Sequence, residues 1–422
     1  MSNNNILNDV FEKFVNNARV FRDREVLRHD YLPDRLPHRE EQIRQVGEIV
    51  APVLKGARSS NVFIYGKTGT GKTAVTKYVL GYLEAKAKEL GAPVRCCYVN
   101  CRIVGSDYRV LATLAQSIGL TVPFTGLSVG EVFDRFRVSL ESSRITLMIV
   151  LDEADALIKV RGDGLLYELT RANENLRSSK LALIGISNDL RLKEFLDPRV
   201  LSSLSEEEIV FRPYDASELR NILRERALVA FHDGALSDAA LGLCSALAAA
   251  EHGDARRALD LLRVAGEVTE RCGATIVLED HVREAEKHIE HNRVFEALKN
   301  LTLHSKLVVL SAYHLNKANI NRAITGDIYE VYSELCTGVG VTPLTQRRLG
   351  SLVNELDSMG LLNAKVISMG RYGRTKKIRL ETSRNTVREV FGKDDRLGRF
   401  IDYEPECLSK NAKCKHKGII GS

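Results

Sequence analysis

Eight residues decide the fold of this 422-residue chain: Gly66-Lys67-Thr68-Gly69-Thr70-Gly71-Lys72-Thr73. They match G-x-x-x-x-G-K-[ST], the pattern of a phosphate-binding loop. The apolar run Asn61–Tyr65 precedes the loop and predicts a short buried strand, while Ala74–Glu84 predicts a helix. In this strand–loop–helix order, backbone N–H groups and the positive end of the helix surround a phosphate chain.

The loop therefore predicts a site for ATP or ADP together with Mg²⁺. We expect Lys72 to reach the β- and γ-phosphates and Thr73 to hold the metal ion. A chance glycine-rich turn is the alternative, and the full motif with its flanking elements disfavours it. The remaining contacts of the loop are expected at Gly66, Lys67, Thr68, Gly69, Thr70, Gly71 and Ala74.

The composition is that of an ordinary globular protein, with 44% hydrophobic residues, 27% charged residues and a net charge of +6. No run of 18 apolar residues predicts a membrane span, and the polar start Met1–Asn8 lacks a signal core. We therefore expect a cytoplasmic protein with reduced cysteines and no membrane partner. Cys407, Cys414 and His416 lack the paired spacing and the fourth ligand of a zinc site.

Three further apolar runs predict buried strands: Val94–Val99, Thr146–Leu151 and Leu181–Ile186. Each run is continuous rather than alternating, and helical patterns separate them. That arrangement is typical of a parallel sheet covered by helices on both faces. From Pro213 to about Ile289 only helical patterns follow. The fold class expected is therefore α/β, with an all-helical segment after the sheet.

Polar residues follow two of these strands. Asp152 and Glu153 end the second run, where we expect Asp152 to orient Mg²⁺ and Glu153 to position and polarise the attacking water. Asn188 follows the third run and can hydrogen-bond the γ-phosphate or the water beside it, although Asn is also common in turns. The letters Asp-Glu-Ala-Asp at 152–155 also occur in RNA helicases, which need a second RecA-like domain that this chain does not predict.

Arg199 stands in Asp197-Pro198-Arg199, downstream of these strand ends. It can reach the nucleotide of a neighbouring subunit as an arginine finger. A solvated surface cation is the other interpretation, and the sequence leaves both open.

The chain resembles an AAA+ ATPase, a P-loop class with a helical lid, because Gly253-Asp254-Ala255-Arg256-Arg257-Ala258-Leu259 fits the sensor segment of such a lid. The resemblance implies that Arg256 contacts the nucleotide, with Arg257 as the alternative. It also implies contacts from Tyr214 and Arg226, for which a packed aromatic ring and a surface cation are the plainer interpretations.

The C-terminal part predicts a winged-helix DNA-binding domain. Thr345–Met359 has an apolar stripe at helical spacing, and two strand-like runs follow, Leu361–Met369 and Lys376–Leu380. Six Lys or Arg residues and no acid lie between Lys365 and Arg379. A recognition helix followed by a basic hairpin fits the grooves of duplex DNA. A solvated basic hairpin is the alternative. The DNA contacts expected are Arg347, Arg348, Arg371, Arg374, Lys376 and Lys377.

From about Leu32 to Leu380 the chain is similar to the archaeal initiators related to the origin recognition complex and its cell-division-cycle partner. The residues that carry this resemblance include Leu36-Pro37-His38-Arg39-Glu40-Glu41-Gln42-Ile43 and Pro123-Phe124-Thr125-Gly126-Leu127-Ser128. It implies ATP-dependent binding to origin duplex DNA, recruitment of the replicative helicase, assembly with other initiator copies and a nucleoid-associated location. It also implies slow ATP hydrolysis as a switch, and a DNA-touching insertion near Leu120–Gly130.

Two other functions use related parts. An ATP-regulated winged-helix transcription regulator would bind promoters and recruit no helicase, and a remodelling ATPase such as an unfoldase would need no winged helix. The expected domains are an N-terminal lead-in at 1–40, an AAA+ base at 41–212, a helical lid at 213–292, a winged helix at 293–386 and a polar tail at 387–422.

Overall fold

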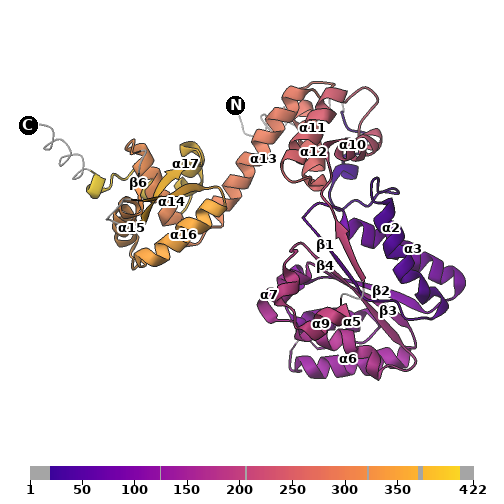
Figure 1. Ribbon diagram of the computed structural model, residues 1–422. Helices are drawn as coiled ribbons and strands as arrows, with labels where there is room; N and C mark the ends of the chain where they lie inside the picture. The colour runs from indigo at the N-terminus through magenta and orange to yellow at the C-terminus, as the bar shows by residue number, and fades with distance from the viewer. Residues whose placement is uncertain (1–19, 124, 205–206, 321–322, 369–373, 409–422) are drawn as a thin grey trace, which may run out of the picture. The chain divides into compact units, whose positions relative to one another are not determined.

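The computed structural model describes residues 20–123, 125–204, 207–320, 323–368 and 374–408. The chain forms two compact units, Met1–Ala285 and Glu286–Ser422 (Figure 1). The division falls inside helix α13 (Glu279–Lys299). The first unit contains a sheet, its covering helices and a helical lid, and the second contains a small antiparallel sheet among helices.

A five-stranded parallel sheet forms the centre of the first unit, in the order β2-β3-β4-β1-β5. The four strands predicted from continuous apolar runs are confirmed. The fifth, β5, was not predicted, because it is short and alternates between exposed and buried residues. The strands are β1 (Val62–Gly66), β2 (Val94–Asn100), β3 (Thr146–Asp152), β4 (Lys180–Ser187) and β5 (Glu207–Phe211).

Helices cover both faces of this sheet (Figure 1). One face packs Val62, Ile64 and Val150 against α2 and α3, and the other packs Phe63 and Ile149 against the remaining helices. Every residue of β3 is buried, which explains its unbroken apolar sequence. The helices are α2 (Glu40–Val50), α3 (Lys72–Leu90), α4 (Cys101–Val104), α5 (Asp107–Ser117), α6 (Val129–Ser143), α7 (Ala154–Arg161), α8 (Gly164–Arg171) and α9 (Pro198–Leu204), with 3-10 turns η2 (Ala51–Lys55), η3 (Ala172–Asn175) and η4 (Leu192–Phe195).

The lid consists of α10 (Ala216–Ala230), α11 (Asp238–Ala250) and α12 (Ala255–Arg271), and the start of α13 follows it. Side chains cap the helices: Asp215 and Glu218 form a capping box at α10, Ser237 caps α11 and Asp254 caps α12. Each cap supplies an acceptor to N–H groups that have no partner within the helix.

The N-terminal strap, residues 20–37, is largely irregular as the sequence predicted, but it also packs against the lid, which the sequence did not predict. Phe21 is 8% exposed and stacks with the ring of Phe231 at 4.9 Å between centroids. The backbone N–H of Val20 donates to Glu270 (3.0 Å), and the short helix η1 (Arg24–Leu27) buries Val26 and Leu27. The strap is therefore part of the lid's core.

The second unit has the architecture expected of a winged helix. A three-stranded antiparallel sheet, in the order β6-β8-β7, packs against three helices, and Leu349, Val353 and Leu356 of α16 lie in the core as the apolar stripe predicted. The elements are α14 (Leu303–Lys317), β6 (Ala323–Ile324), α15 (Thr325–Val339), α16 (Gln346–Ser358), β7 (Leu362–Ser368) and β8 (Arg374–Leu380).

The predicted polar tail begins inside a helix, so its start at 387 is corrected. Helix α17 (Arg384–Gly392) and the turn η6 (Gly398–Phe400) bury Val387, Phe391 and Phe400 in the core of the second unit. Charged and polar residues separate the few apolar ones here, which hid this amphipathic stretch in the sequence. The lysines of 410–417, Cys414 and His416 lie outside the described residues.

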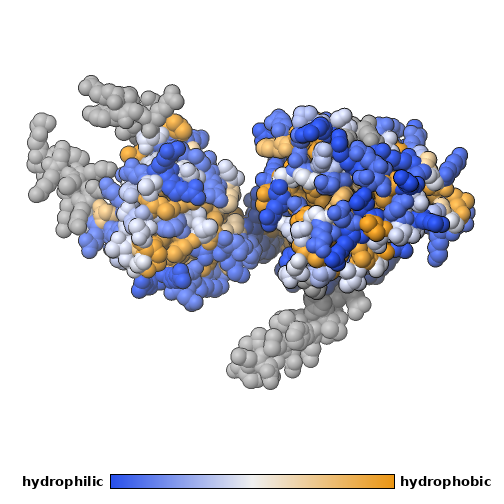
Figure 2. All heavy atoms as spheres, turned by 90° about the horizontal axis from the view of Figure 1, so that it is seen from below, coloured by the Kyte–Doolittle hydropathy of each residue, from blue (hydrophilic) through white to orange (hydrophobic). Residues whose placement is uncertain are grey.

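The surface mixes hydrophilic residues with scattered hydrophobic ones (Figure 2). Among the described residues, no helix combines the length and apolar character needed to cross a bilayer.

Candidate nucleotide site and DNA-binding module

The phosphate-binding loop leaves β1 and enters α3 through glycines with positive φ. Gly71 has φ +89° and caps α3, and Gly69 has φ +73°. A side chain at Gly69 would clash with the carboxylate of Asp254, whose Oδ1 lies 1.7 Å from the position of an added Cβ. The glycine thus allows the N-terminus of lid helix α12 to approach the loop closely, and the N–H of Ala255 donates to the Gly69 carbonyl at 3.1 Å.

Lys72 occupies the first turn of α3 with its ammonium folded over the loop. Its Nζ donates to the carbonyls of Gly66 (2.8 Å) and Lys67 (2.7 Å). Burial lowers the pKa of this ammonium to about 8, against the opposing effect of Asp152. A desolvated cation in a loop of N–H groups suits the charge of a phosphate chain.

Thr73 and Asp152 meet at the predicted Mg²⁺ site. The Thr73 hydroxyl donates to Asp152 Oδ2 at 2.7 Å, and the Tyr98 hydroxyl donates to the same oxygen at 2.6 Å. The N–H of Glu153 donates to Oδ1 at 2.8 Å. A hydroxyl and a carboxylate side by side are the hard oxygen ligands that Mg²⁺ prefers, so the residues fit this ion.

Glu153 and Asn188 line the same cavity. Glu153 has φ +52°, a left-handed conformation that is rare for a non-glycine residue and occurs often at functional sites. Asn100 Nδ2 (3.4 Å) and Arg102 Nη1 (3.5 Å) donate to its carboxylate. Asn188 comes directly after β4, and its backbone N–H donates to Asp155 Oδ1 at 3.3 Å.

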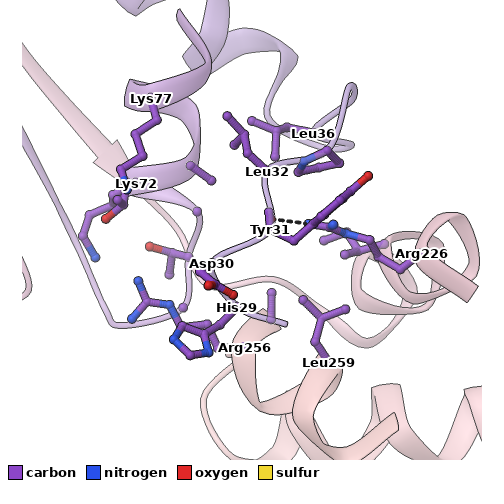
Figure 3. A pocket seen from close by; sticks show the side chains of 18 of the residues that line it. His29, Asp30, Tyr31, Leu32, Leu36, Lys72, Lys77, Arg226, Arg256 and Leu259 are labelled. Carbon is purple, nitrogen blue, oxygen red and sulfur yellow. Dashed lines mark hydrogen bonds between the residues drawn. The ribbon is translucent and has the colours of Figure 1, made fainter. Parts of the chain in front are cut away.

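The cavity has a volume of ≈ 390 Å³ and lies within the first unit, between loop, strand ends, lid and N-terminal strap. In the close-up of Figure 3, His29, Asp30 and Tyr31 of the strap lie between α3, which carries Lys72 and Lys77, and α12, which carries Arg256 and Leu259. Its size is in the range of small-molecule sites.

Of the two lid arginines, Arg256 lines the cavity, and its charge helps to lower the pKa of Lys72. Arg257 instead pairs with Glu251, at 2.9 Å from Nε to Oε2. Since a side chain that is held by a carboxylate is less available to a phosphate, the structure favours Arg256 over the alternative.

Tyr214 and Arg226 also line the cavity, and each has a partner in the N-terminal half of the chain. Tyr214 stacks on the guanidinium of Arg39 at 3.8 Å. Arg226 donates to the carbonyls of Val26 (3.1 Å) and Tyr31 (3.2 Å), and its guanidinium lies 4.7 Å from the Tyr31 ring centre (Figure 3). In this structure Arg226 therefore fixes the strap, and its contact with a nucleotide remains a prediction.

Arg199 does not line this cavity. It is exposed on α9 and pairs with Asp197, at 3.1 Å from Nε to Oδ1. The position is compatible with a contact to another subunit, which remains a prediction.

The predicted DNA contacts fall into two groups. Arg347 and Arg348 are exposed in the first turn of α16. Lys376 is turned back onto that helix, where its Nζ donates to the Gly350 carbonyl (3.3 Å) and to Asn354. Lys377 lies in β8 opposite Lys365 of β7. Arg371 lies outside the described residues, and only the backbone of Arg374 is described.

The segment Leu120–Gly130, expected to be a DNA-touching insertion, is partly tied to the base. Leu120, Val122 and Leu127 pack against the core of the first unit. Only part of this apolar segment is therefore available for contact with DNA, and Phe124 lies outside the described residues.

Several residues near the cavity were not predicted. Tyr98 holds Asp152, Asp254 touches the phosphate loop, and His29 and Asp30 line the cavity from the strap. Their contacts join segments far apart in the chain, so no local pattern reveals them. Arg39 belongs to the segment Leu36–Ile43, which supports the family resemblance, but the sequence assigned no role to this arginine.

Three family models match consecutive parts of the chain. The AAA domain matches residues 57–192, the Cdc6 AAA+ ATPase-type lid domain matches 220–287, and the CDC6 C-terminal winged helix domain matches 296–390. Their order and limits agree with the sheet, the lid and the helix–hairpin unit described above.

The chain is also similar to named proteins over almost all of its length. It is 50% identical over 397 residues to an ORC1-type DNA replication protein of Thermococcus onnurineus, covering 93% of this chain and 96% of that one. The ORC1-type DNA replication protein 1 of Archaeoglobus fulgidus is 46% identical over 398 residues, which cover 94% of this chain and 97% of that one.

Among solved structures, the Aeropyrum pernix ORC1 protein in complex with DNA matches with a TM-score of 0.83 and 48% identity, covering 90% of this chain and 99% of that one. The Aeropyrum pernix ORC2 protein, in ADPNP–ADP complexes, matches at 22% identity with a TM-score of 0.58 over 92% and 100% of the two chains, and this shows the fold alone. Three domains in this order, with identity near one half along the whole chain, leave one assignment: the chain belongs to the archaeal ORC1/Cdc6 family of DNA replication proteins.

Proposed function

We propose that this protein is an ATP-controlled initiator that binds origin duplex DNA and helps to recruit the replicative helicase. The observation that supports this most directly is the cavity, to which the phosphate loop, two strand ends and the lid each contribute a predicted ATP contact: Lys72, Asp152, Asn188 and Arg256. A ligand that touches loop and lid at once favours one arrangement of the two over others.

Within this proposal the residues around the triphosphate have distinct tasks. Lys72 neutralises the β- and γ-phosphates, and Thr73 with Asp152 would hold Mg²⁺, which supplies charge neutralisation at the transferring phosphoryl group. Glu153 orients and polarises the attacking water. Asn100 and Arg102 donate to the Glu153 carboxylate and help to orient it. Slow hydrolysis that acts as a switch is what the family resemblance implies, and we include it in the proposal.

The winged helix supplies the DNA-binding part of the proposal. Arg347 and Arg348 are exposed where α16 begins, the end of a recognition helix that enters the major groove in related motifs. The relative from Aeropyrum pernix, 48% identical, was solved with DNA. We extend that activity to this chain, with phosphate contacts holding it on the duplex and base contacts providing selectivity.

Footprinting on the chromosome of the source organism, with and without ATP, tests origin binding. Protection should concentrate at sites where replication starts and should change with nucleotide. Protection confined to promoters would contradict the proposal and favour a transcription regulator. Co-purification with the replicative helicase on a protected fragment tests recruitment.

A salt titration tests the residues of the DNA surface. Replacing Arg347 and Arg348 together by Ala should lower duplex affinity and reduce the slope of log affinity against log salt by about 1 for each phosphate that is no longer neutralised. Arg388→Ala is the matched control, because Arg388 is exposed on α17 and pairs with Asp402. An unchanged slope in the double variant would exclude this end of α16 from the phosphate backbone.

A further inference from the structure

Arg39 is an arginine with almost no access to solvent. It is 1% exposed, although it precedes the first residue of α2 on a chain segment with no predicted role. Burial lowers the pKa of its guanidinium, so holding a cation here costs the fold some stability. Its guanidinium donates hydrogen bonds to three main-chain carbonyls, those of His38, Thr70 and Arg212.

The bond to Thr70 fixes a peptide plane in the phosphate loop. Arg39 Nε donates to the Thr70 carbonyl at 2.9 Å. In a planar trans peptide the carbonyl oxygen of one residue and the N–H of the next point in opposite directions. A fixed Thr70 oxygen therefore fixes the direction of the Gly71 N–H, one of the donors that a phosphate-binding loop offers to its anion.

The other side of the same guanidinium holds the junction of sheet and lid. Nη2 donates to the carbonyl of Arg212 at 2.7 Å, and Arg212 lies between the end of β5 and the start of α10. The guanidinium also lies 3.8 Å from the centre of the Tyr214 ring, which belongs to the same junction. Tyr214 in turn lies against the loop, because a Cβ added at Gly71 would be 2.8 Å from its hydroxyl.

We propose that Arg39 is a positioning residue that couples the phosphate loop to the lid through its contacts with Thr70, Arg212 and Tyr214. This rests on the proposed binding of nucleotide in the cavity. A phosphate chain that draws in the Gly71 N–H shifts the Thr70 carbonyl, and the rigid guanidinium transmits this shift to the lid junction. Because coupling between two sites is reciprocal, the position of the lid sets the affinity of the loop for phosphate in the same degree.

The test is Arg39→Lys in the full-length protein, since a lysine keeps the charge but has one nitrogen and cannot span three separated carbonyls. Dyes on Tyr82→Cys of α3 and Leu228→Cys of α10, both exposed, report the distance between base and lid, with exposed Cys272 replaced by Ser. In the parent, ADP or ATP should change this distance. In Arg39→Lys, the affinity for nucleotide should fall about tenfold or more. At saturating nucleotide, the change in the distance between the dyes should be at most half of the change in the parent.

An Arg39→Lys variant with parental affinity and the full distance change at saturation would overturn the proposal. A parent that binds nucleotide without any distance change would overturn it as well, because there would be no coupling to transmit. A parent that binds no nucleotide contradicts the proposed function instead, so the two failures are distinguishable.

Two controls separate coupling from a general loss of stability. Arg44→Lys changes an exposed arginine on α2, the helix that Arg39 precedes; Arg44 pairs with Glu41, and the variant should keep the parental affinity and distance change. Leu140→Ala creates a cavity in the base core away from the junction, and should lower stability while the distance change at saturation persists. If Arg39→Lys does not fold, Tyr214→Leu removes the stacked ring and should at least halve the distance change; a full change would overturn the proposal.

Discussion

At the scale of single residues, the Asp152 carboxylate shows how the site is organised in advance. Three donors hold it: the hydroxyls of Thr73 and Tyr98 on Oδ2 and the N–H of Glu153 on Oδ1. A carboxylate whose neighbours fix its direction presents its oxygens to a metal ion with little reorganisation. Tyr98, which the sequence did not suggest, is thus as much a part of this arrangement as the motif residues.

Lys72 predicts a pH dependence of nucleotide binding. Its pKa of about 8 lies below the ordinary value because burial disfavours the charged form, and the phosphates' negative charge raises the pKa again on binding. Above about pH 8 the free protein loses this proton, so affinity should fall as pH rises and binding should take up a proton. Calorimetry of ADP binding at about pH 9, in buffers of different ionisation enthalpy, measures this uptake.

Lys72→Arg is the matched control for that measurement, because its guanidinium stays protonated throughout this range. It should show no buffer-dependent enthalpy from this group. The same proton uptake in parent and variant would assign the titration to another residue.

Glu153→Gln predicts a separation of binding from hydrolysis. The amide keeps the shape of the side chain and leaves the left-handed backbone of residue 153 unchanged, but it cannot accept a proton from water. ATP turnover should fall by a factor of about 10² to 10⁴, while affinity for ATP stays within a few-fold. Single-turnover hydrolysis and equilibrium binding measure the two effects. Glu168→Gln, exposed on α8, should change neither, and normal turnover in Glu153→Gln would remove this residue as the catalytic group.

At the scale of elements, the N-terminal strap is the part that local patterns hid. Its contacts run to residues more than 200 positions away: Phe21 to Phe231, and Val20 to Glu270. The strap has neither a long helical nor a long alternating pattern, so periodicity gives no signal. By contrast, β3 and β4 are buried on both faces, and their sequences predicted them directly.

The same reasoning explains which site residues the sequence could predict. Lys72, Thr73, Asp152 and Asn188 sit at the ends of strands or in a local motif, where order along the chain implies position in the sheet. Arg39 depends on three carbonyls, two of them from distant segments, and main-chain acceptors leave no trace in a sequence. The sequence predicted the winged helix because α16 has an apolar stripe and a basic hairpin follows it. It did not predict α17, because acidic and basic residues separate the few apolar residues of this helix.

Phe21→Ala tests whether the strap belongs to the lid. The ring covers Gly266, where an added Cβ would lie 2.2 Å from Phe21 Cζ, and stacks on Phe231. Removing it should lower the free energy of unfolding of the first unit by about 3 kcal/mol. Urea denaturation followed by circular dichroism measures this decrease. Leu228→Ala, exposed on α10, should cost less than about 0.5 kcal/mol, and equal decreases in the two variants would contradict the assignment.

At the scale of the whole molecule, the two compact units differ in what they should respond to. The ATP contacts that we propose belong to Met1–Ala285, and the DNA contacts that we propose for the winged helix belong to Glu286–Ser422. Ligand that binds only the folded form of a unit stabilises that unit by mass action.

Thermal unfolding should therefore show two transitions with separate ligand responses. ADP at about 100 times its Kd should stabilise the first unit by about 2.7 kcal/mol and leave the second unchanged. Duplex DNA should raise mainly the second transition. Scanning calorimetry measures both, with Lys72→Ala as the control that no longer shows the ADP effect. An ADP shift of equal size in both transitions would show that the units unfold together.

The pairing of the strap with the lid has a consequence for biosynthesis. Val20 leaves the ribosome about 250 residues before Glu270, its hydrogen-bond partner. At roughly 5–20 residues per second, Val20 is synthesised about 12–50 s before its hydrogen-bond partner. The base sheet can form in that interval, whereas the contact between Phe21 and Phe231 can form only after the lid helix α10 has been made. The earliest residues of the described protein are therefore among the last to find their place, and a nascent chain halted before the lid would expose Phe21 to chaperones.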